Sequence, residues 1–432
     1  MQRATRSGAQ RRGGTRMTQT TGARSEWKAG WTVVLASGFG FVVSGIHLYS
    51  IGLFLEPLER EFGWPRSAMT GAMMIPSVFA FFLSPVFGHF VDRWGARHIG
   101  LVGAASYFAA FALLGLTGAQ IWNWWLLWVL LALSLVLVKP TVWSSALSSR
   151  FATGRGFALA VALCGTGVGS LVTPLAANFL IDRFGWRLAF AGLGMGWAVI
   201  ILPILVLFFF DARDIGRRTA SPSPVALAGL TVHQGLRSRS FYTLALVALI
   251  ATAIIVGTVV HLVPMLSGTG IARATAAGIA GTLGVTSIIG RLSVGLLLDR
   301  TKGPQVAAIS LGLPAVSALL LLLAPGSVPV GIAAAAVLGL SIGAELDSVI
   351  YLATRYFGMR NYGALFGFIA ALISTGTGLG PLTASALFDH FGSYEPFLLT
   401  IIPAALLCSL LTATMGAYPE HRLDHQPNAD GQ

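Results

Sequence analysis

The sequence predicts an all-α membrane protein, with twelve transmembrane helices in two pseudo-symmetric six-helix bundles. Three observations predict this fold: a very apolar composition, twelve apolar runs of membrane-spanning length, and an internal repeat. Only 10% of the 432 residues are charged, 55% are hydrophobic, and the mean hydropathy is +0.76. Soluble domains carry about 25% charged residues. The composition therefore excludes a soluble multidomain enzyme, and its hydrophobic content excludes a disordered chain.

Each predicted helix has the roughly 20 mainly apolar residues that are needed to cross a bilayer. We expect transmembrane helices at residues 31–55, 67–88, 98–118, 122–147, 157–181, 188–210, 241–266, 274–298, 305–325, 329–353, 363–388 and 396–418. The predicted segments are a disordered cytoplasmic basic tail (1–30), an N-terminal six-helix bundle (31–210), a cytoplasmic central loop (211–240), a C-terminal six-helix bundle (241–418) and a cytoplasmic tail (419–432).

The distribution of Lys and Arg predicts that both termini are cytoplasmic. Of the 28 cations, twenty-one lie on the side of the termini and five on the other side, and short cytoplasmic loops are the ones that collect such cations. The formal charge of +12 thus reflects topology and indicates no nucleic-acid partner. The remaining two cations, Lys139 and Arg291, fall inside predicted helices. We expect a monomeric multi-pass protein of the cell (inner) membrane, in contact with the lipid bilayer.

Residues 207 positions apart match along the chain. The segment 88–93 (GHFVDR) matches 295–300 (GLLLDR), and each copy follows the second predicted helix of its half. Further matches are Arg66 with Arg273, Gly71 with Gly278, Pro174 with Pro381 and Asp182 with Asp389. Many transporters consist of repeated halves, so the repeat predicts a duplication of six helices.

The loop after the second helix resembles the signature of the major facilitator superfamily, G-x-x-x-D-R-x-G-R-K. The matching residues are Gly88, Asp92, Arg93, Gly95 and Arg97, whereas His98 stands where another basic residue is usual. Within that superfamily the chain resembles the monocarboxylate transporters and the oxalate/formate antiporters. The stretches that carry this narrower resemblance are Arg155-Gly156, Gly290-Arg291-Leu292, Arg355-Tyr356-Phe357-Gly358 and Tyr362-Gly363.

The Asp-Arg loops of the two halves are predicted to act as conformational latches at the cytoplasmic membrane edge. A carboxylate there can accept N–H groups from a facing helix N-terminus, where the helix dipole favours an anion. The resemblance implies the same role. The alternative is a tight connection with solvated charges. The candidate gating residues are Gly88, Asp92, Arg93, Gly95, Arg97, Gly295, Asp299 and Arg300.

Arg291 is the main candidate for substrate binding. It lies eight residues before Asp299, about 12 Å along the helix from the membrane edge. An arginine at that depth needs a cavity or a partner, and its planar fork suits a carboxylate. In monocarboxylate transporters an arginine of the eighth helix binds the substrate anion, and Arg291 matches that position. The alternative is an ion pair between helices. Ser287 stands where that family often has an acidic residue linked to proton coupling.

Other polar residues inside predicted helices are candidates for binding and coupling. Lys139 of the fourth helix lies at a depth similar to that of Glu345 and Asp347 of the tenth, its counterpart in the other half. We expect Lys139 to pair with one of these carboxylates, either as a switch or as a static ion pair. The two carboxylates cannot both face it, because residues two apart lie about 200° apart around a helix. His47 and Tyr49 are further candidates for substrate binding. His47 is a candidate proton site or a buried, hydrogen-bonded histidine.

The glycine-rich runs 165–169 and 376–380 do not indicate a nucleotide-binding loop, because each lies inside an apolar helix. Small residues at such places let helices approach closely. The sequence has no Walker lysine, zinc-ligand cluster or Ser/His/Asp set, so we expect no enzyme, cofactor or metal site. We predict a secondary active transporter that moves a small organic monocarboxylate by alternating access, coupled to a proton. The alternatives are an organic anion exchanger, an exporter of amphipathic compounds and a non-transporting membrane sensor.

Overall fold

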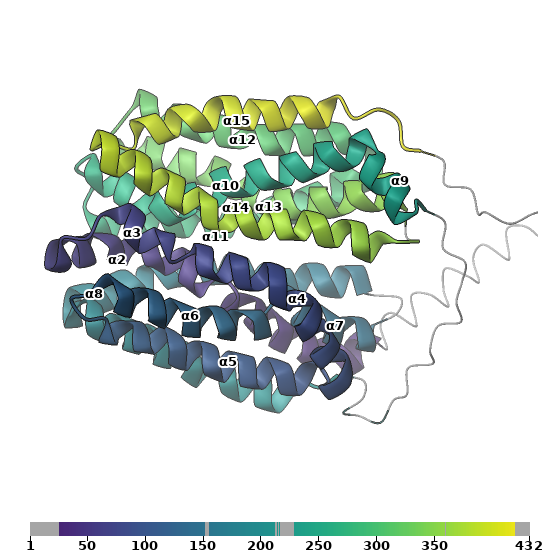
Figure 1. Cartoon of the computed structure of the whole chain (residues 1–432), viewed down its shortest axis with the longest axis horizontal. Helices are drawn as coiled ribbons and strands as arrows, with labels where there is room; N and C mark the ends of the chain where they lie inside the picture. The colour runs from purple at the N-terminus through teal and green to yellow at the C-terminus, as the bar shows by residue number, and fades with distance from the viewer. Residues whose placement is uncertain are drawn as a thin grey trace, which may run out of the picture.

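The computed structural model describes residues 26–151, 155–211, 214, 216, 229–358 and 360–419, which form an almost entirely helical molecule (Figure 1). The first half contains the helical segment 26–43, α2 (Ile46–Phe62), α3 (Arg66–Gly71), α4 (Met74–Trp94), α5 (Ala96–Leu113), η1 (Leu114–Leu116), α6 (Ile121–Leu137), α7 (Pro140–Arg150) and α8 (Arg155–Phe208). The second half contains α9 (Val232–Arg237), α10 (Arg239–Gly268), α11 (Arg273–Arg300), α12 (Gly303–Leu323), α13 (Val328–Phe357), α14 (Tyr362–Phe391) and α15 (Glu395–Ala413).

The helical membrane fold expected from the sequence is confirmed. Ten helical stretches within the described residues are long and apolar enough to cross a membrane. One of them, α8, spans both the fifth and the sixth predicted helices. Its backbone leaves the helical conformation at Gly185, and this kink separates the two helices. Gly185 (φ 77°) and its repeat partner Gly392 (φ 70°) both adopt a left-handed conformation that favours glycine, so the duplicated halves turn at equivalent positions.

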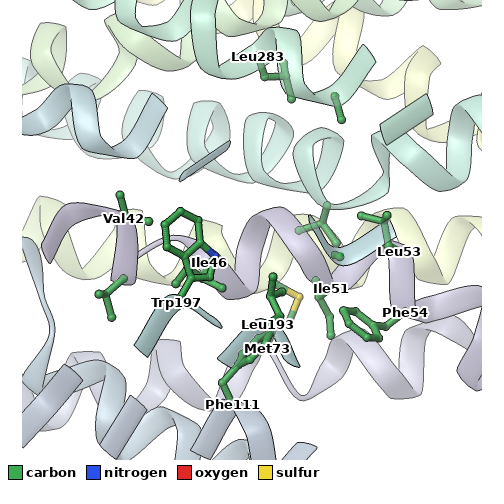
Figure 2. Close-up of a cluster of buried hydrophobic side chains, with 14 of the residues drawn as sticks. Val42, Ile46, Ile51, Leu53, Phe54, Met73, Phe111, Leu193, Trp197 and Leu283 are labelled. Atoms are coloured by element: carbon green, nitrogen blue, oxygen red, sulfur yellow. The ribbon is translucent and has the colours of Figure 1, made fainter. Parts of the chain in front are cut away.

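The two halves lie side by side, and the helices that face each other are α2 and α10, α3 and α4 against α14, and α8 against α11 (Figure 1). Buried apolar side chains fill the first half and continue across this contact. In Figure 2, Phe54 of α2 and Phe111 of α5 lie in one cluster with Trp197 of α8, and Leu283 of α11 approaches from the other half. Phe54 also stacks on Phe190, with 3.8 Å between ring centroids. The halves therefore share one apolar interface.

Three transmembrane segments of the first half are interrupted. The breaks lie at residues 44–45 in the first segment, 72–73 in the second and 138–139 in the fourth. Their counterparts in the second half, α10, α11 and α13, run unbroken for 30, 28 and 30 residues. Irregular backbone at membrane depth is tolerated where it is buried in protein or lines a cavity. The halves thus match in helix number but differ in their interior.

Pro140 explains the third break, which the predicted continuous helix 122–147 did not include. A residue before proline is disfavoured in helical conformation, and Lys139 is extended (φ −61°, ψ 152°). The helix therefore ends at Leu137 and restarts at Pro140. Side chains satisfy the freed carbonyl of Val138, which accepts hydrogen bonds from Ser44 Oγ (2.6 Å) and Trp143 Nε1 (3.1 Å).

Several predicted boundaries shift. The first helix begins at residue 26, not 31, and Trp27 packs on Phe151 and Phe157 at 5.6 and 5.3 Å between ring centroids. The predicted central loop contains α9, and the backbone N–H of Leu230 binds the carbonyl of Phe357 at 2.8 Å. Residues 1–25 of the predicted tail, most of 212–228 and residues 420–432 lie outside the described residues.

The glycine-rich runs bring helices into close contact, as their small size predicts. A Cβ atom on Gly165 would lie 2.0 Å from the carbonyl oxygen of Gly38, and one on Gly380 would lie 2.0 Å from that of Ala253. A side chain at either position would push the facing backbone away. The glycines therefore set the distance between neighbouring helices.

We expect Gly380→Ala to lower the free energy of unfolding by about 1–3 kcal/mol, because its Cβ would force α14 away from α10. Thermal denaturation of the detergent-solubilised protein measures the effect. Gly367→Ala, in the same helix, is the matched control, since no atom lies within 4 Å of its added Cβ. Equal denaturation midpoints for the two variants would contradict the packing role of Gly380.

Candidate functional site

Arg291 lies within α11 and pairs with a carboxylate of the neighbouring helix α13. Its Nη1 donates a hydrogen bond to Asp347 Oδ1 at 3.2 Å, and the two groups form a salt bridge. The arginine side chain is only 9% exposed, against 22% for the aspartate. Removing a charge from water is so unfavourable that a buried guanidinium requires such a partner. The second half therefore holds an arginine–aspartate pair with no net charge.

Glycines bring α11 and α13 close enough for this pair to form. A Cβ atom on Gly290 would lie 2.4 Å from the carbonyl oxygen of Leu340, and one on Gly343 would lie 2.0 Å from that of Ser287. Only glycine fits at these contacts. Gly290 is part of the Gly-Arg-Leu stretch on which the family resemblance rests, and its role here is to bring the backbone of α13 next to the arginine.

The second carboxylate of α13 bonds to a different helix. Glu345 Oε1 accepts a 2.5 Å hydrogen bond from Thr252 Oγ1 of α10. Glu345 and Asp347 thus have different neighbours, as their spacing along the helix predicts. Ser287, one turn before Arg291, donates to the carbonyl of Gly284 at 2.9 Å. The carboxylate beside Arg291 therefore comes from α13 and not from α11.

Lys139 lies in the first half at the break between α6 and α7, and it does not pair with either carboxylate of α13. Its Nζ is 3.5 Å from the carbonyl oxygen of Ala80, to which it donates. Glu345 and Asp347 both bond within the second half. The expected pairing of Lys139 with the tenth helix is therefore wrong for this structure. Asp347 bonds instead to Arg291 of α11, the helix that the Gly290 and Gly343 contacts hold against α13.

His47 and Tyr49 of α2 line different cavities. His47 lines a cavity of about 250 Å³ together with Lys139, and its Nδ1 lies 3.4 Å from the hydroxyl of Tyr107. Tyr49 lines a smaller cavity between the halves, to which Arg291 does not contribute. Of the four predicted substrate-binding residues, Lys139 and His47 thus share a cavity, whereas Tyr49 and Arg291 lie apart from it.

The predicted gating loops are described in part. The side chains of Asp92 and Asp299 are not described, and neither are those of residues 89–91. Arg93 and Arg300 are exposed near the ends of α4 and α11. No atom lies within 4 Å of the place where a Cβ on Gly295 would sit. The latch role of these loops stays a prediction.

The last part of the first loop fastens it to the sixth transmembrane helix. Gly95 precedes α5 with φ 84°, which favours glycine. Arg97 donates from Nη1 and Nη2 to the carbonyls of Phe209 and Val206, each at 2.8 Å. Gly95 and Arg97 thus hold the loop against the end of α8 within the same half.

Residues that the site prediction did not include join the two halves where α3 begins and α14 ends, at the left in Figure 1. Asp389 of α14 accepts hydrogen bonds from the backbone N–H groups of Arg66 (3.0 Å) and Ser67 (2.8 Å) at the start of α3. The start of a helix carries partial positive charge and favours a carboxylate. On the other side of the interface, Arg273 of α11 forms an ion pair with Asp182 of α8. We call these five residues the seam.

The seam follows the internal repeat. Arg66 and Arg273 are repeat partners, and so are Asp182 and Asp389. Each half therefore supplies an arginine at the start of its second segment and an aspartate at the end of its fifth. Both matches are visible in the sequence, and they are the signal from which the seam could have been predicted.

The guanidinium of Arg66 extends the seam into a network. It bonds to Glu59 at 2.9 Å and to the Tyr394 hydroxyl at 2.8 Å, and it lies 3.9 Å from the ring centre of Phe388. Burial raises the pKa of Tyr394 to about 12, so its hydroxyl stays protonated at neutral pH and can donate to His261 Nδ1 at 2.8 Å. His261 is thus a buried, hydrogen-bonded histidine at the contact between the halves.

The central groups are suited to binding and exchanging anions. The Arg291 guanidinium can exchange one carboxylate for another, since both would use the same planar donors. Within the described residues, no three His, Cys, Asp or Glu side chains gather as a metal ion would require. The interactions that Arg291 and Asp347 offer are charge pairing and hydrogen bonding.

The comparisons with known proteins agree with this architecture. The model of the Major Facilitator Superfamily matches residues 37–360. Monocarboxylate transporter 11 of Mus musculus is 30% identical over 398 residues, which cover 85% of this chain and 83% of that protein. Multidrug resistance protein MdtG of Dickeya zeae (strain Ech586) is 27% identical over 375 residues, covering 84% and 87% of the two chains.

A solved structure has the same fold. The crystal structure of a mutant of the nucleoside transporter NupG superposes with a TM-score of 0.70 and 12% sequence identity, covering 89% of this chain and 99% of that one. The superfamily and its monocarboxylate transporters are the groups that the sequence motifs resemble, and that resemblance is confirmed. The chain is a multi-pass membrane transporter and not an enzyme, and it belongs to the Major Facilitator Superfamily.

Proposed function

We propose that this transporter moves a small organic monocarboxylate across the cell (inner) membrane by alternating access, with a proton as the coupling ion. The observation that carries the proposal is the salt bridge between the buried Arg291 and the half-buried Asp347. An arginine whose resting partner is a carboxylate offers the geometry and the charge that a substrate carboxylate needs. The similarity to monocarboxylate transporter 11 supports the same substrate class.

In the proposed exchange, the substrate takes the place of Asp347 on the guanidinium. The bond between Arg291 and Asp347 breaks, a proton adds to the released aspartate, and the substrate carboxylate forms the new bond to the arginine. The site is then neutral with substrate bound and neutral when empty, so neither form carries a net charge through the membrane. One proton moves with each carboxylate. Asp347 thereby takes the role that the family resemblance assigns to the position of Ser287.

The seam is proposed to be the outer gate. The Lys and Arg distribution supports an orientation in which the termini are cytoplasmic and the end that holds the seam faces outside. Opening towards the outside must break the bonds of Asp389 and Arg273 to the other half. Each of these bonds involves a charge, so together they stabilise the closed form.

Export of an amphipathic compound is the second candidate, and the similarity to a multidrug resistance protein favours it. Transport assays in proteoliposomes separate the two. Accumulation of a monocarboxylate that is driven by an inward proton gradient supports the first proposal, and extrusion of a hydrophobic cation in place of carboxylate uptake supports the second.

We expect Arg291→Gln to abolish carboxylate uptake and to weaken carboxylate binding at least about tenfold, since charge-assisted hydrogen bonds are lost. The measurement is thermal stabilisation by a panel of aliphatic, keto and aromatic monocarboxylates. The double variant Arg291→Gln/Asp347→Asn removes both charges and controls for an unpaired buried aspartate. Full stabilisation in both variants would overturn the assignment of Arg291.

We expect Asp347→Asn to retain exchange but to lose accumulation driven by a pH gradient, because an amide cannot carry the proton. Uptake and counterflow in proteoliposomes give the two rates. Glu345→Gln is the matched variant, two residues away on the same helix and bonded to Thr252. Loss of coupling in Glu345→Gln with normal coupling in Asp347→Asn would place the proton on Glu345 and contradict the exchange.

We expect Asp389→Asn to weaken the seam and expose it from outside. Ser267 lines a cavity of about 130 Å³ with Arg66 and Arg273, and its hydroxyl is buried. With Cys164 and Cys408 replaced by alanine, Ser267→Cys should react faster with an impermeant maleimide when Asp389→Asn is also present. Glu395→Gln removes an acidic residue of α15 at the same end and should leave the rate unchanged. Equal rates with and without Asp389→Asn would contradict a gating role.

A further inference from the structure

A ring of hydrogen bonds joins the two halves beside the seam. Arg66 Nη1 donates to the Tyr394 hydroxyl at 2.8 Å, and this hydroxyl lies 2.8 Å from His261 Nδ1. On its other side, His261 Nε2 lies 3.1 Å from Ser385 Oγ, which bonds to Thr70 Oγ1 at 2.9 Å. Thr70 also bonds to the backbone carbonyl of Arg66 at 3.0 Å, which closes the ring. Helix α3 of the first half thus supplies both ends, and His261 of α10 lies on the far side of the ring.

The neighbours of His261 determine which ring nitrogen carries its proton. Nε2 lies 3.1 Å from the carbonyl oxygen of Pro381, and a carbonyl can only accept, so the proton is on Nε2. Nδ1 is then the acceptor, and the Tyr394 hydroxyl donates to it. The same hydroxyl accepts from Arg66. The ring is therefore complete with a neutral imidazole.

A second proton on His261 does not fit this arrangement. Nδ1–H and the Tyr394 O–H would then be two donors aimed at each other, at a place where both residues are buried. Turning the hydroxyl round would aim its proton at the guanidinium of Arg66, which is the other group bonded to it. Two positive charges joined through one hydroxyl would also repel each other. The closed ring therefore excludes the imidazolium form.

Arg66 is the charged residue that belongs to the ring, and Glu59 of α2, at 2.9 Å, offsets part of its charge. Further charged groups at the seam end, on the helices packed against α10, are Glu56 of α2, Arg273 of α11, Asp389 of α14 and Glu395 of α15. Deeper in the membrane, Glu345 of α13 bonds to Thr252, nine residues from His261 along α10. A proton on His261 would thus lie two hydrogen bonds from the charge of Arg66.

Opening of the seam removes the conflict. When α3 moves away from α14, Arg66 leaves Tyr394 and Thr70 leaves Ser385 in the same movement, because both residues belong to α3. The Tyr394 hydroxyl is then free to turn and accept from Nδ1–H, and water can solvate its proton and the imidazolium. A histidine in contact with water changes its charge near neutral pH. The open form therefore accepts a proton that the closed form refuses.

We propose that His261 is a proton-responsive positioning residue of the outer gate, neutral while the seam is closed and protonated from outside when the seam opens. The inference deepens the proposed function and rests on its assignment of the seam as the outer gate. His261 acts on the gate alone, whereas Asp347 takes the proton that accompanies the substrate. A ligand that binds one of two forms shifts the equilibrium towards that form. Low external pH thus favours the open form and high external pH the closed form.

Distances between spin labels on the two halves, measured by double electron–electron resonance in nanodiscs, test the inference. The labels are placed on Gln120→Cys, between η1 and α6, and on Thr269→Cys, between α10 and α11, because both positions are exposed at the seam end. Cys164 and Cys408 are replaced by alanine. All samples carry Arg291→Gln/Asp347→Asn, so that the central pair does not contribute to the pH dependence.

The variants compared in this parent are His261→Gln, which cannot be protonated, and His390→Gln, the matched control. His390 is exposed at the same end of α14 and lies outside the ring. Asp389→Asn tests the gate itself and should raise the long-distance population at every pH. Thermal denaturation reports whether each variant folds.

Lowering the pH from about 8 to about 5 should raise the ratio of long to short distances about tenfold in the parent and in His390→Gln, as a tenfold difference in proton affinity between the two forms requires. Loss of this response in His261→Gln supports the inference. A response that persists in His261→Gln, or a parent that shows none, overturns it.

Where His261→Gln fails to fold, Tyr394→Phe decides, because without the hydroxyl the contact between two donors cannot arise. Its response to pH should then be smaller than that of the parent, and an unchanged response overturns the inference. Failure of the proposed function has a different signature. Distances that do not change in Asp389→Asn count against the seam as the gate, and uptake that survives Arg291→Gln counts against the substrate site, whatever the pH response of His261→Gln.

Discussion

A guanidinium buried between apolar helices must be neutralised, and the Arg291–Asp347 pair meets this requirement across two helices. The partner comes from α13, so the charge state of the site depends on how α11 and α13 pack. Gly290 and Gly343 hold these helices at a distance that no larger residue would allow. Any ligand that replaces the aspartate must therefore match its charge, or the arginine is left buried and unpaired.

The same requirement shapes the contact between the halves. The seam pairs an arginine-bearing segment of each half with an aspartate of the other, and the internal repeat relates the two pairs. They are not identical in detail. Asp389 uses the backbone at the start of α3, which leaves the Arg66 side chain for Glu59 and Tyr394, whereas Asp182 bonds to the guanidinium of Arg273. Duplication thus preserved the charges while the geometry of the two sides diverged.

The two halves also differ in the continuity of their transmembrane helices. The second half keeps its inner helices continuous and carries the charge pair. The first half interrupts three of its helices, and side chains such as Ser44 and Trp143 satisfy the backbone groups that the break at Pro140 exposes. Backbone N–H and C=O groups that lack hydrogen-bond partners are unfavourable in a membrane. Polar side chains are therefore needed at the helix breaks to supply those partners.

Helix number, duplication and the family followed from the sequence alone, because the length of an apolar run and a repeated motif are local properties of the chain. The separation of Glu345 from Asp347 also followed, since helical geometry fixes the angle between neighbouring residues. Only the tertiary structure decided that Arg291, and not Lys139, bonds to Asp347, and that Arg66 and Asp389 meet in the seam. Those pairings depend on which helices touch and at what register, and close glycine contacts spread over distant segments determine that register together.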